Sequence, residues 1–293
     1  MKIKCFGWRN EKLDQISRIE KGLIENGHII TDDCPDIVYS NNDFYDDILN
    51  FASKQKFRPF IILNILDLQL DNPDYSLEKL TFQLKQADAV TCISETVKKE
   101  IVENLNIIPK VIYNPIKPVF YNPNIQKDIF SLFVGRARSP NKRVIELIKP
   151  LWFNLKKYYN DKAVHFVGPE DPNFGMWHGI VNDEELNNLY NRSLLGIISS
   201  KREGLNLPLI EMICSNCIPI VCEDMSTSQE FAPKELLCEA NSEAIFYKMK
   251  EVIENLQYYV DICYRKSVIY KEQFSDRMVA KRIIDTYDKF KKQ

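Results

Sequence analysis

Short apolar segments rich in β-branched residues alternate with longer segments of helical periodicity along most of the chain. Apolar runs of this length are typical of buried parallel strands, and apolar positions three or four apart are typical of amphipathic helices. The expected strands are KIKCFG, DIVYS, FIILNIL, AVTCIS and KVIYNP, and later IFSLFVGR, AVHFVG, LGIISS and IPIVCE. The expected helices are 15–26, 77–86, 95–104, 143–159, 183–192, 209–215 and 241–254. The alternation predicts an α/β protein with two parallel sheets flanked by helices, in two Rossmann-like domains.

A segment rich in proline and asparagine, YNPIKPVFYNPN, separates the two groups of strands. Such residues stop regular structure and are typical of a linker or hinge. We therefore expect a first domain at 1–119 and a second that begins at residue 120. After Phe231 the chain is expected to be mostly helical.

Composition and charge narrow the class of protein. The chain has 293 residues, of which 45% are hydrophobic and 27% charged, and this suits two soluble globular domains. A formal net charge of -2 argues against a general nucleic-acid binder. The first residues, MKIKCFGWRNEKLDQ, lack the apolar run of a signal peptide, and no later run is long enough to span a bilayer. A cytoplasmic location is the expectation.

The eight cysteines are expected to be reduced core residues in that compartment. Cys214 and Cys217 in CSNC have the spacing of zinc ligands, but no second pair completes a ligand set. Packing is therefore favoured over a metal or redox role. The sequence also contains neither G-x-G-x-x-G after its first strand nor a P-loop motif. A bound nucleotide would have to be held by other means.

Two carboxylates, Glu203 and Glu211, stand eight positions apart in SSKREGLNLPLIEMICSNCIPIVCED. LGIISS reads as a strand, and Pro208 suits the first turn of the helix that follows. The loop between them lies at the carboxyl end of a strand, where open α/β sheets bind ligands, and a helix N-terminus there attracts anions. The alternative is that Glu211 only offsets the helix dipole and that Glu203 is a solvated loop residue.

A second candidate constellation is FVGRARSPNKRV, which also follows a strand and precedes a helix. Gly135 permits a tight turn, and a curling loop would bring Arg136 and Lys142 to one point. Arginine offers a planar fork to phosphate oxygens and lysine a mobile point charge, so the pair suits a diphosphate. The alternative is two ordinary solvated cations.

These motifs occur in an order that resembles a known family. The strand ending in VGR, the lysine six residues after the arginine, HFVG, NDEELNNLYNRSLLGIISS and EGLNLPLIEMICSNCIPIV resemble the second domain of retaining glycosyltransferases of family 4. ADAVTCISETVKKEIVENLNIIPKVIYNPIKPVFYNP resembles the interdomain region of that family, and FSDRMVAKRIIDTYDKF its final helix. The resemblance implies the GT-B fold, in which two Rossmann-like domains face a cleft. It also implies an acceptor domain at 1–119, completed by a returning helix at 275–293, and a donor domain at 120–274.

The resemblance assigns roles to individual residues. Arg136 and Lys142 would bind the donor diphosphate, and Glu203 would lie against the donor sugar. The ribose would be held by Glu211. The remaining positions implied in nucleotide-sugar binding are Gly135, Gly168, Ile180, Gly204, Leu205, Asn206 and Leu207. The donor would be a UDP- or GDP-sugar, bound without a metal or other cofactor. Its sugar would move with retention in a front-face reaction, in which the departing phosphate helps to deprotonate the acceptor hydroxyl.

The first domain departs from the family pattern. CFGWRNEK offers only Gly7 where the family has a glycine-rich turn, and Asp67 stands near the place of a family histidine. Asp67 is either a hydrogen-bonding group for the sugar, and so a fourth catalytic candidate, or a plain loop acid. The acceptor, a carbohydrate, a lipid-linked group or another hydroxyl compound, is not identified, and peripheral membrane contact stays open. The rival predictions are a catalytically silent nucleotide-binding protein, a two-lobed solute-binding protein and a nucleotide-sugar epimerase.

Overall fold

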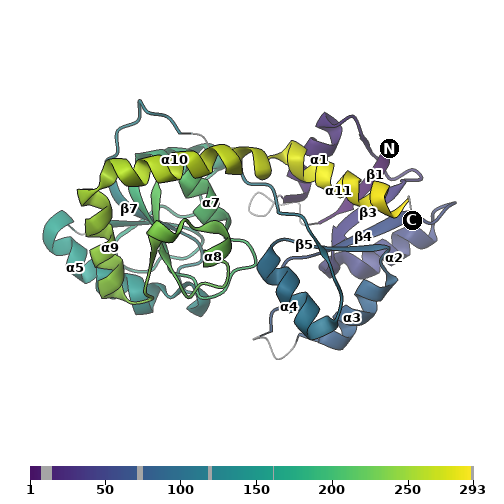
Figure 1. Cartoon of the computed structure of the whole chain (residues 1–293), viewed down its shortest axis with the longest axis horizontal. Helices are drawn as coiled ribbons and strands as arrows, with labels where there is room; N and C mark the ends of the chain where they lie inside the picture. Colours follow the sequence, from purple (N-terminus) through teal and green to yellow (C-terminus); the bar gives the residue numbers. More distant parts are fainter. Residues whose placement is uncertain (8–14, 71–74, 118–120, 161, 292–293) are drawn as a thin grey trace. The chain divides into compact units, whose positions relative to one another are not determined.

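The computed structural model describes residues 1–7, 15–70, 75–117, 121–160 and 162–291. The chain divides into two compact units (Figure 1). Unit 1 consists of Met1–Pro115 and Glu272–Gln293, and unit 2 of Ile116–Lys271. The boundary expected from the sequence, between residues 119 and 120, falls outside the described residues.

Unit 1 is built on a six-stranded parallel sheet with the order β2-β1-β3-β4-β5-β6. Its strands are β1 Lys2–Phe6, β2 Ile29–Ile30, β3 Ile37–Asn41, β4 Phe60–Ile65, β5 Ala89–Cys92 and β6 Lys110–Val111. Its α-helices are α1 Gln15–Glu25, α2 Tyr45–Ser53, α3 Leu77–Gln86, α4 Glu95–Leu105 and α11 Asp276–Phe290. All five strands expected in this part of the sequence are confirmed.

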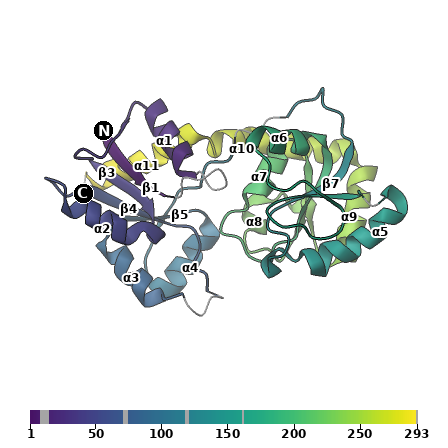
Figure 2. The same ribbon diagram turned by 180° about the vertical axis from the view of Figure 1, so that it is seen from behind.

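The core of unit 1 lies between its sheet and two helices from opposite ends of the chain. Helices α1 and α11 pack side by side (Figure 2). Their apolar residues are buried with those of the strands in one cluster, which includes Ile3, Ile62 and Ile283. A Cβ atom on Gly22 of α1 would lie 2.0 Å from the carbonyl oxygen of Asp276, so only glycine permits this close approach.

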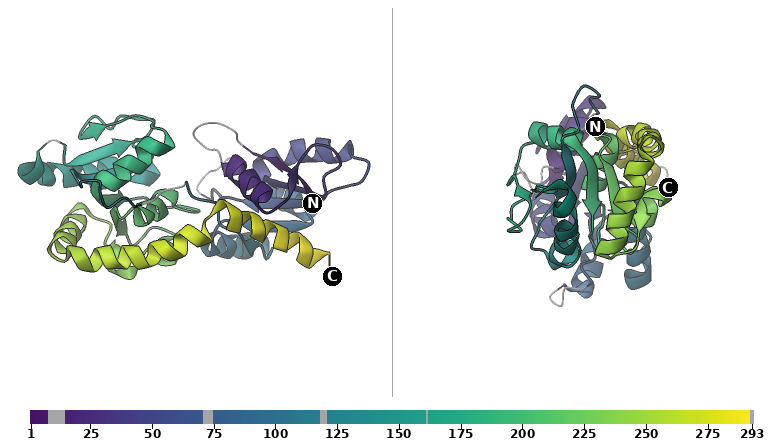
Figure 3. Two further views of the ribbon diagram at one scale, coloured as in Figure 1. Left: turned by 90° about the horizontal axis from the view of Figure 1, so that it is seen from above. Right: turned by 90° about the vertical axis from the view of Figure 1, so that its left-hand side faces the viewer.

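Unit 2 is a second six-stranded parallel sheet, with the order β12-β11-β10-β7-β8-β9. Helices lie on both sides of it (Figure 3). Its strands are β7 Ile129–Val134, β8 Val164–Val167, β9 Met176–Trp177, β10 Ser193–Ile198, β11 Ile218–Cys222 and β12 Leu237–Cys238. The helices of this part of the chain are α5 Lys149–Tyr159, α6 Asp183–Arg192, α7 Leu207–Cys214, α8 Ser228–Phe231, α9 Ser242–Glu254 and α10 Leu256–Gln273. The expected α/β class, with two parallel sheets and flanking helices, is confirmed.

The helix expected over 143–159 begins differently from the prediction. Arg143 adopts a left-handed backbone conformation with φ of 50°, and Val144–Ile148 forms a π-helical turn before α5 starts.

Cys214 and Cys217 are buried, and this burial raises the pKa of each thiol to about 12. No helix in the described part of the chain combines the length and apolarity needed to cross a bilayer.

Candidate functional site

The candidate residues of unit 2 lie in loops at the carboxyl ends of neighbouring parallel strands. One loop follows β7 and carries Gly135 to Lys142, and another follows β10 and carries Glu203. Strand β10 pairs with β7 on one side and with β11 on the other, so these loops share one edge of the sheet. Open α/β sheets bind their ligands at this edge.

Two glycines bring the ends of β7 and β8 into close contact. The backbone N–H of Gly135 donates to the carbonyl of Val167 over 2.9 Å. Gly168 has φ of 155°, and a Cβ atom there would lie 2.0 Å from the carbonyl oxygen of Gly135. The two predicted glycines therefore form a backbone junction at this edge, and a side chain at Gly168 would block it.

Replacing Gly168 by alanine should destabilise unit 2 by about 2–4 kcal/mol, because the new methyl group meets a backbone carbonyl in a conformation that favours glycine. The measurement is the thermal unfolding midpoint. Gly179→Ala is the matched control, because φ at Gly179 is 75° but the nearest atom to an added Cβ is 3.9 Å away. An equal loss in both variants would contradict the clash and leave backbone strain alone.

The loop after β7 curls back so that Lys142 lies against Gly135, with its Cε atom 3.5 Å from the Cβ position of that glycine. The Lys142 ammonium forms a 2.5 Å ion pair with Glu203, and both side chains are only 16% exposed. The predicted cation of the first loop and carboxylate of the second therefore meet. The Arg136 side chain is exposed and makes no hydrogen bond or ion pair within the described residues.

Helix α7 begins at Leu207 with proline in its first turn, as the sequence predicts. The side chain of Asn206 caps it by accepting a 3.0 Å hydrogen bond from the N–H of Leu209. Asn206 is 2% exposed and also donates to the Met225 sulfur, so asparagine at this position has a structural reason. The backbone from Gly204 to Leu207 therefore forms the capped N-terminus of a helix at the candidate site.

Glu211 lies one turn into α7 and is 3% exposed. One carboxylate oxygen accepts a 2.9 Å hydrogen bond from the Tyr190 hydroxyl, and the other accepts from the backbone N–H of Lys117 over 3.4 Å. Burial first, and then the charge of Glu211, raise the pKa of Tyr190 well above its usual value, so its hydroxyl stays a donor. The sequence missed this partner, because an aromatic residue at a helical apolar position reads as core. The ribose role of Glu211 stays a prediction.

A histidine in β8 and a histidine just after β9 are in contact. The Nδ1 atom of His165 and the Nε2 atom of His178 are 2.9 Å apart. Next to them, the indole N–H of Trp177 donates to the Gly168 carbonyl over 3.0 Å, and Ile180 is exposed. Gly168 and Ile180, the two positions implied in nucleotide binding here, thus lie in one small loop cluster.

Acid should destabilise unit 2 through this histidine pair. Burial, and then the neighbouring His178, lower the pKa of His165 to about 4. In the unfolded chain His165 takes up a proton below its ordinary pKa of about 6.5, whereas in the folded chain it stays neutral down to about pH 4. The free energy of unfolding therefore falls as the pH is lowered through that range. After allowance for partial exposure the loss is about 1–2 kcal/mol. Calorimetry between pH 7 and 4 should show a smaller fall for His165→Gln, and an unchanged fall would contradict the assignment.

Asp67 belongs to unit 1 and lies just beyond the carboxyl end of β4. The charge of Asp67 acts on Tyr75: burial first, and then the charges of Asp43 and Asp67, raise the pKa of the Tyr75 phenol to about 12. Nearby Asn42 acts in the opposite direction and lowers this pKa, although the buried Tyr75 hydroxyl makes no hydrogen bond with it. These residues surround the ends of β3 and β4, the edge at which α/β sheets bind ligands.

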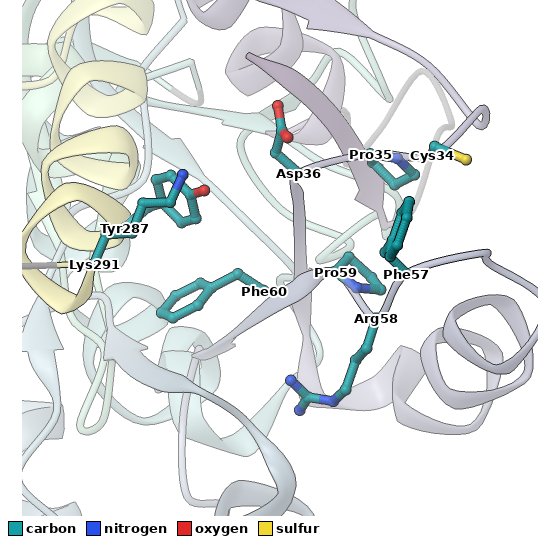
Figure 4. A pocket seen from close by; sticks show the side chains of 9 residues that line it. All are labelled: Cys34, Pro35, Asp36, Phe57, Arg58, Pro59, Phe60, Tyr287 and Lys291. Carbon is teal, nitrogen blue, oxygen red and sulfur yellow. The ribbon is translucent and has the colours of Figure 1, made fainter.

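A hollow of about 370 Å³ lies at the opposite edge of this sheet (Figure 4). Its lining comes from the segments just before β3 and β4 and from the end of α11, and consists of Cys34, Pro35, Asp36, Phe57, Arg58, Pro59, Phe60, Tyr287 and Lys291. Arg58 is already held by an ion pair with Asp88. The hollow therefore lies away from the candidate residues of unit 1.

Comparison with known proteins adds one sequence relative. A protein of Methanocaldococcus jannaschii described as an uncharacterized glycosyltransferase is 28% identical over 211 residues. The match covers 68% of this chain and 57% of that protein, so the chain spans little more than half of this curated relative. No family model matches the sequence.

Within the described residues, no group of three or more histidine, cysteine or acidic side chains is arranged to hold a metal ion.

Solved structures match nearly the whole chain. HepE from Anabaena, solved with UDP, with UDP and glucose, and with UDP-glucose, aligns with TM-scores of 0.72–0.73. The identity is 12–14%, over 98–99% of this chain and 99–100% of HepE. Sucrose-phosphate synthase from Thermosynechococcus elongatus aligns with a TM-score of 0.67 at 14% identity, over 94% of this chain and 77% of that one. These alignments confirm the expected GT-B type of fold.

Proposed function

We propose that the protein is a retaining glycosyltransferase that moves a sugar from a nucleoside-diphosphate sugar to an acceptor hydroxyl. The observation that carries this proposal is the meeting of Lys142 and Glu203 beside the Gly135–Gly168 junction, at the carboxyl edge of the unit 2 sheet. The similarity to HepE, which was solved with UDP-glucose, supports a nucleotide-sugar donor. The relative described as a glycosyltransferase supports the reaction class.

The chemistry of the loops accounts for the transfer step. Lys142 and Arg136 supply positive charge where the diphosphate gains negative charge as the glycosidic bond breaks, and the capped N-terminus of α7 adds backbone donors. In this scheme Glu203 orients the donor sugar, Glu211 holds the ribose, and no divalent metal takes part. Because a leaving diphosphate accepts the proton of the acceptor hydroxyl, the reaction needs no carboxylate pair of the glycosidase type.

The domains take different roles in this proposal. Residues 120–274 hold the UDP- or GDP-sugar, and residues 1–119 with the helix at 275–293 receive the acceptor, with Asp67 as a hydrogen-bonding group for the sugar. The acceptor is a carbohydrate, a lipid-linked group or another hydroxyl compound, reached in the cytoplasm or by peripheral membrane contact.

The first test is a thermal-shift screen against UDP, GDP, ADP and their sugar conjugates, because a ligand that binds the folded state raises the unfolding midpoint. One nucleotide is expected to give a clear shift, and Arg136→Ala should reduce that shift and abolish sugar transfer without altering the midpoint of the free protein. No shift with any nucleotide would overturn the proposal. Binding without transfer or donor hydrolysis, over a wide acceptor panel, would instead favour a catalytically silent nucleotide-binding protein.

A further inference from the structure

Arg143 follows Lys142 and has a role that the proposed function does not include. Its guanidinium forms a bidentate ion pair with Asp224, with Nη1 and Nη2 donating over 2.6 and 2.7 Å. Its Nε atom donates to the Ser199 carbonyl over 2.6 Å, and Nη2 also donates to the Ser200 carbonyl over 3.2 Å. One side chain that is 8% exposed therefore joins the loops that follow β7, β10 and β11.

The backbone beside Arg143 repeats this connection. The carbonyl of Lys142 accepts a 2.6 Å hydrogen bond from the Ser199 hydroxyl. The amide side chain of Asn141 donates to the carbonyl of Arg202 over 2.7 Å and accepts from its N–H over 2.8 Å. The residues on both sides of Lys142 are therefore hydrogen-bonded to the loop that carries Glu203.

The loop after β11 also contacts Glu203, through its backbone. The Ser226 hydroxyl accepts a 3.0 Å hydrogen bond from the N–H of Glu203 and donates to its carbonyl over 3.0 Å. The N–H of Ser226 donates to the carbonyl of Lys201 over 3.1 Å. Asp224 lies two residues before Ser226, so the ion pair with Arg143 anchors the segment that supports Glu203.

Arg143 itself is unsuited to binding a phosphate. It is buried, its charge is balanced by Asp224, and its donors point to protein oxygens. Only a planar fork with a separate Nε–H donor fits the carboxylate and the two carbonyls together, and a lysine ammonium cannot reproduce this geometry. Its left-handed backbone conformation is one that residues other than glycine seldom adopt, which indicates that the surrounding contacts fix it.

We propose that Arg143 is a positioning residue, which sets the distance between the Lys142 ammonium and the Glu203 carboxylate by clamping the three loops. This role rests on the proposed function, which assigns the Lys142 ammonium and the Glu203 carboxylate to the donor site. A displacement of about 1 Å at such a site is enough to cost about 100-fold in rate.

The clamp is tested by hydrogen exchange in Arg143→Lys, without any ligand. Amides of residues 199–206 should exchange about tenfold faster than in the unaltered protein, since they lose the fixed anchor. Arg192→Lys is the matched control, because Arg192 also forms a bidentate pair, with Asp128 at the amino end of β7. Equal exchange of residues 199–206 in the two variants would overturn the clamp.

Its action through Lys142 is tested by a double-mutant cycle on UDP binding, measured by calorimetry. Arg143→Lys should weaken binding about tenfold, and should add less than threefold when Lys142 is already methionine. Arg192→Lys should change nothing in either background. Fully additive losses would overturn a role exerted through Lys142. If the unaltered protein bound none of UDP, GDP and ADP, the proposed function would fail, while the exchange experiment would still decide whether the clamp exists.

Discussion

Replacing Lys142 by methionine is expected to lower the turnover number for sugar transfer by about 100- to 1000-fold, the usual cost of losing one group that stabilises charge in a transition state. Methionine keeps most of the length of the side chain but removes the ammonium beside Gly135. Steady-state kinetics with the nucleotide sugar identified by thermal shift measures the effect. UDP affinity should also fall, by about tenfold or more, because a charge-assisted contact with the diphosphate is lost.

Lys149→Met is the control for this substitution, because Lys149 is an exposed lysine at the start of α5. It should leave both turnover and affinity unchanged. Turnover of Lys142→Met close to that of the unaltered protein, in a variant with a normal unfolding midpoint, would remove Lys142 from the reaction.

Replacing Glu203 by glutamine should change binding and turnover in opposite directions. The carboxylate now holds the Lys142 ammonium at 2.5 Å, so it competes with an incoming diphosphate for the same cation. A neutral amide removes that competition and the repulsion of the phosphate, and UDP affinity should rise about tenfold. Transfer should nevertheless fall about 100-fold, because the group expected to orient the donor sugar has lost its charge. Calorimetry with UDP and steady-state kinetics measure the two effects.

The control for this second change is Glu184→Gln, at an exposed acid in the first turn of α6. It should alter neither quantity. Weaker UDP binding by Glu203→Gln would mean that Glu203 supports the diphosphate site, and would contradict the competition between the two anions.

The sequence predicted the fold well where strands were long and apolar. All nine expected strands are present, and α3 and α6 have the bounds that the pattern indicated. The strands it missed, β2, β9 and β12, have two residues each and leave almost no periodic signal. Helix α2 was missed as well, because only Tyr45 and Ile48 among its nine residues are buried. Periodicity thus reports elements that bury a regular apolar face.

The candidate site was predictable only in part. The family resemblance implied that Lys142 and Glu203 both act at the donor site. Their convergence follows from their place after β7 and β10, which the structure shows to be neighbouring parallel strands. Arg143 carried a weak signal, as a fourth cation in the loop that also carries Arg136, Arg138 and Lys142. Its contacts depend on how the loops after β7, β10 and β11 meet in space. The hydrogen bond from Tyr190 to Glu211 likewise joins α6 to α7, and no spacing along the chain specifies it.

Helix α11 has a consequence for how the chain is made. The cluster that closes the core of unit 1 combines residues from Ile3 to Ile112 with residues from Val279 to Tyr287. During synthesis on the ribosome, the sheet of unit 1 therefore keeps an apolar face exposed until all of unit 2 and then α11 have been synthesised. We expect unit 2 to finish folding first, and chains interrupted before residue 279 to be bound by chaperones or degraded rather than to persist as a free amino-terminal fragment.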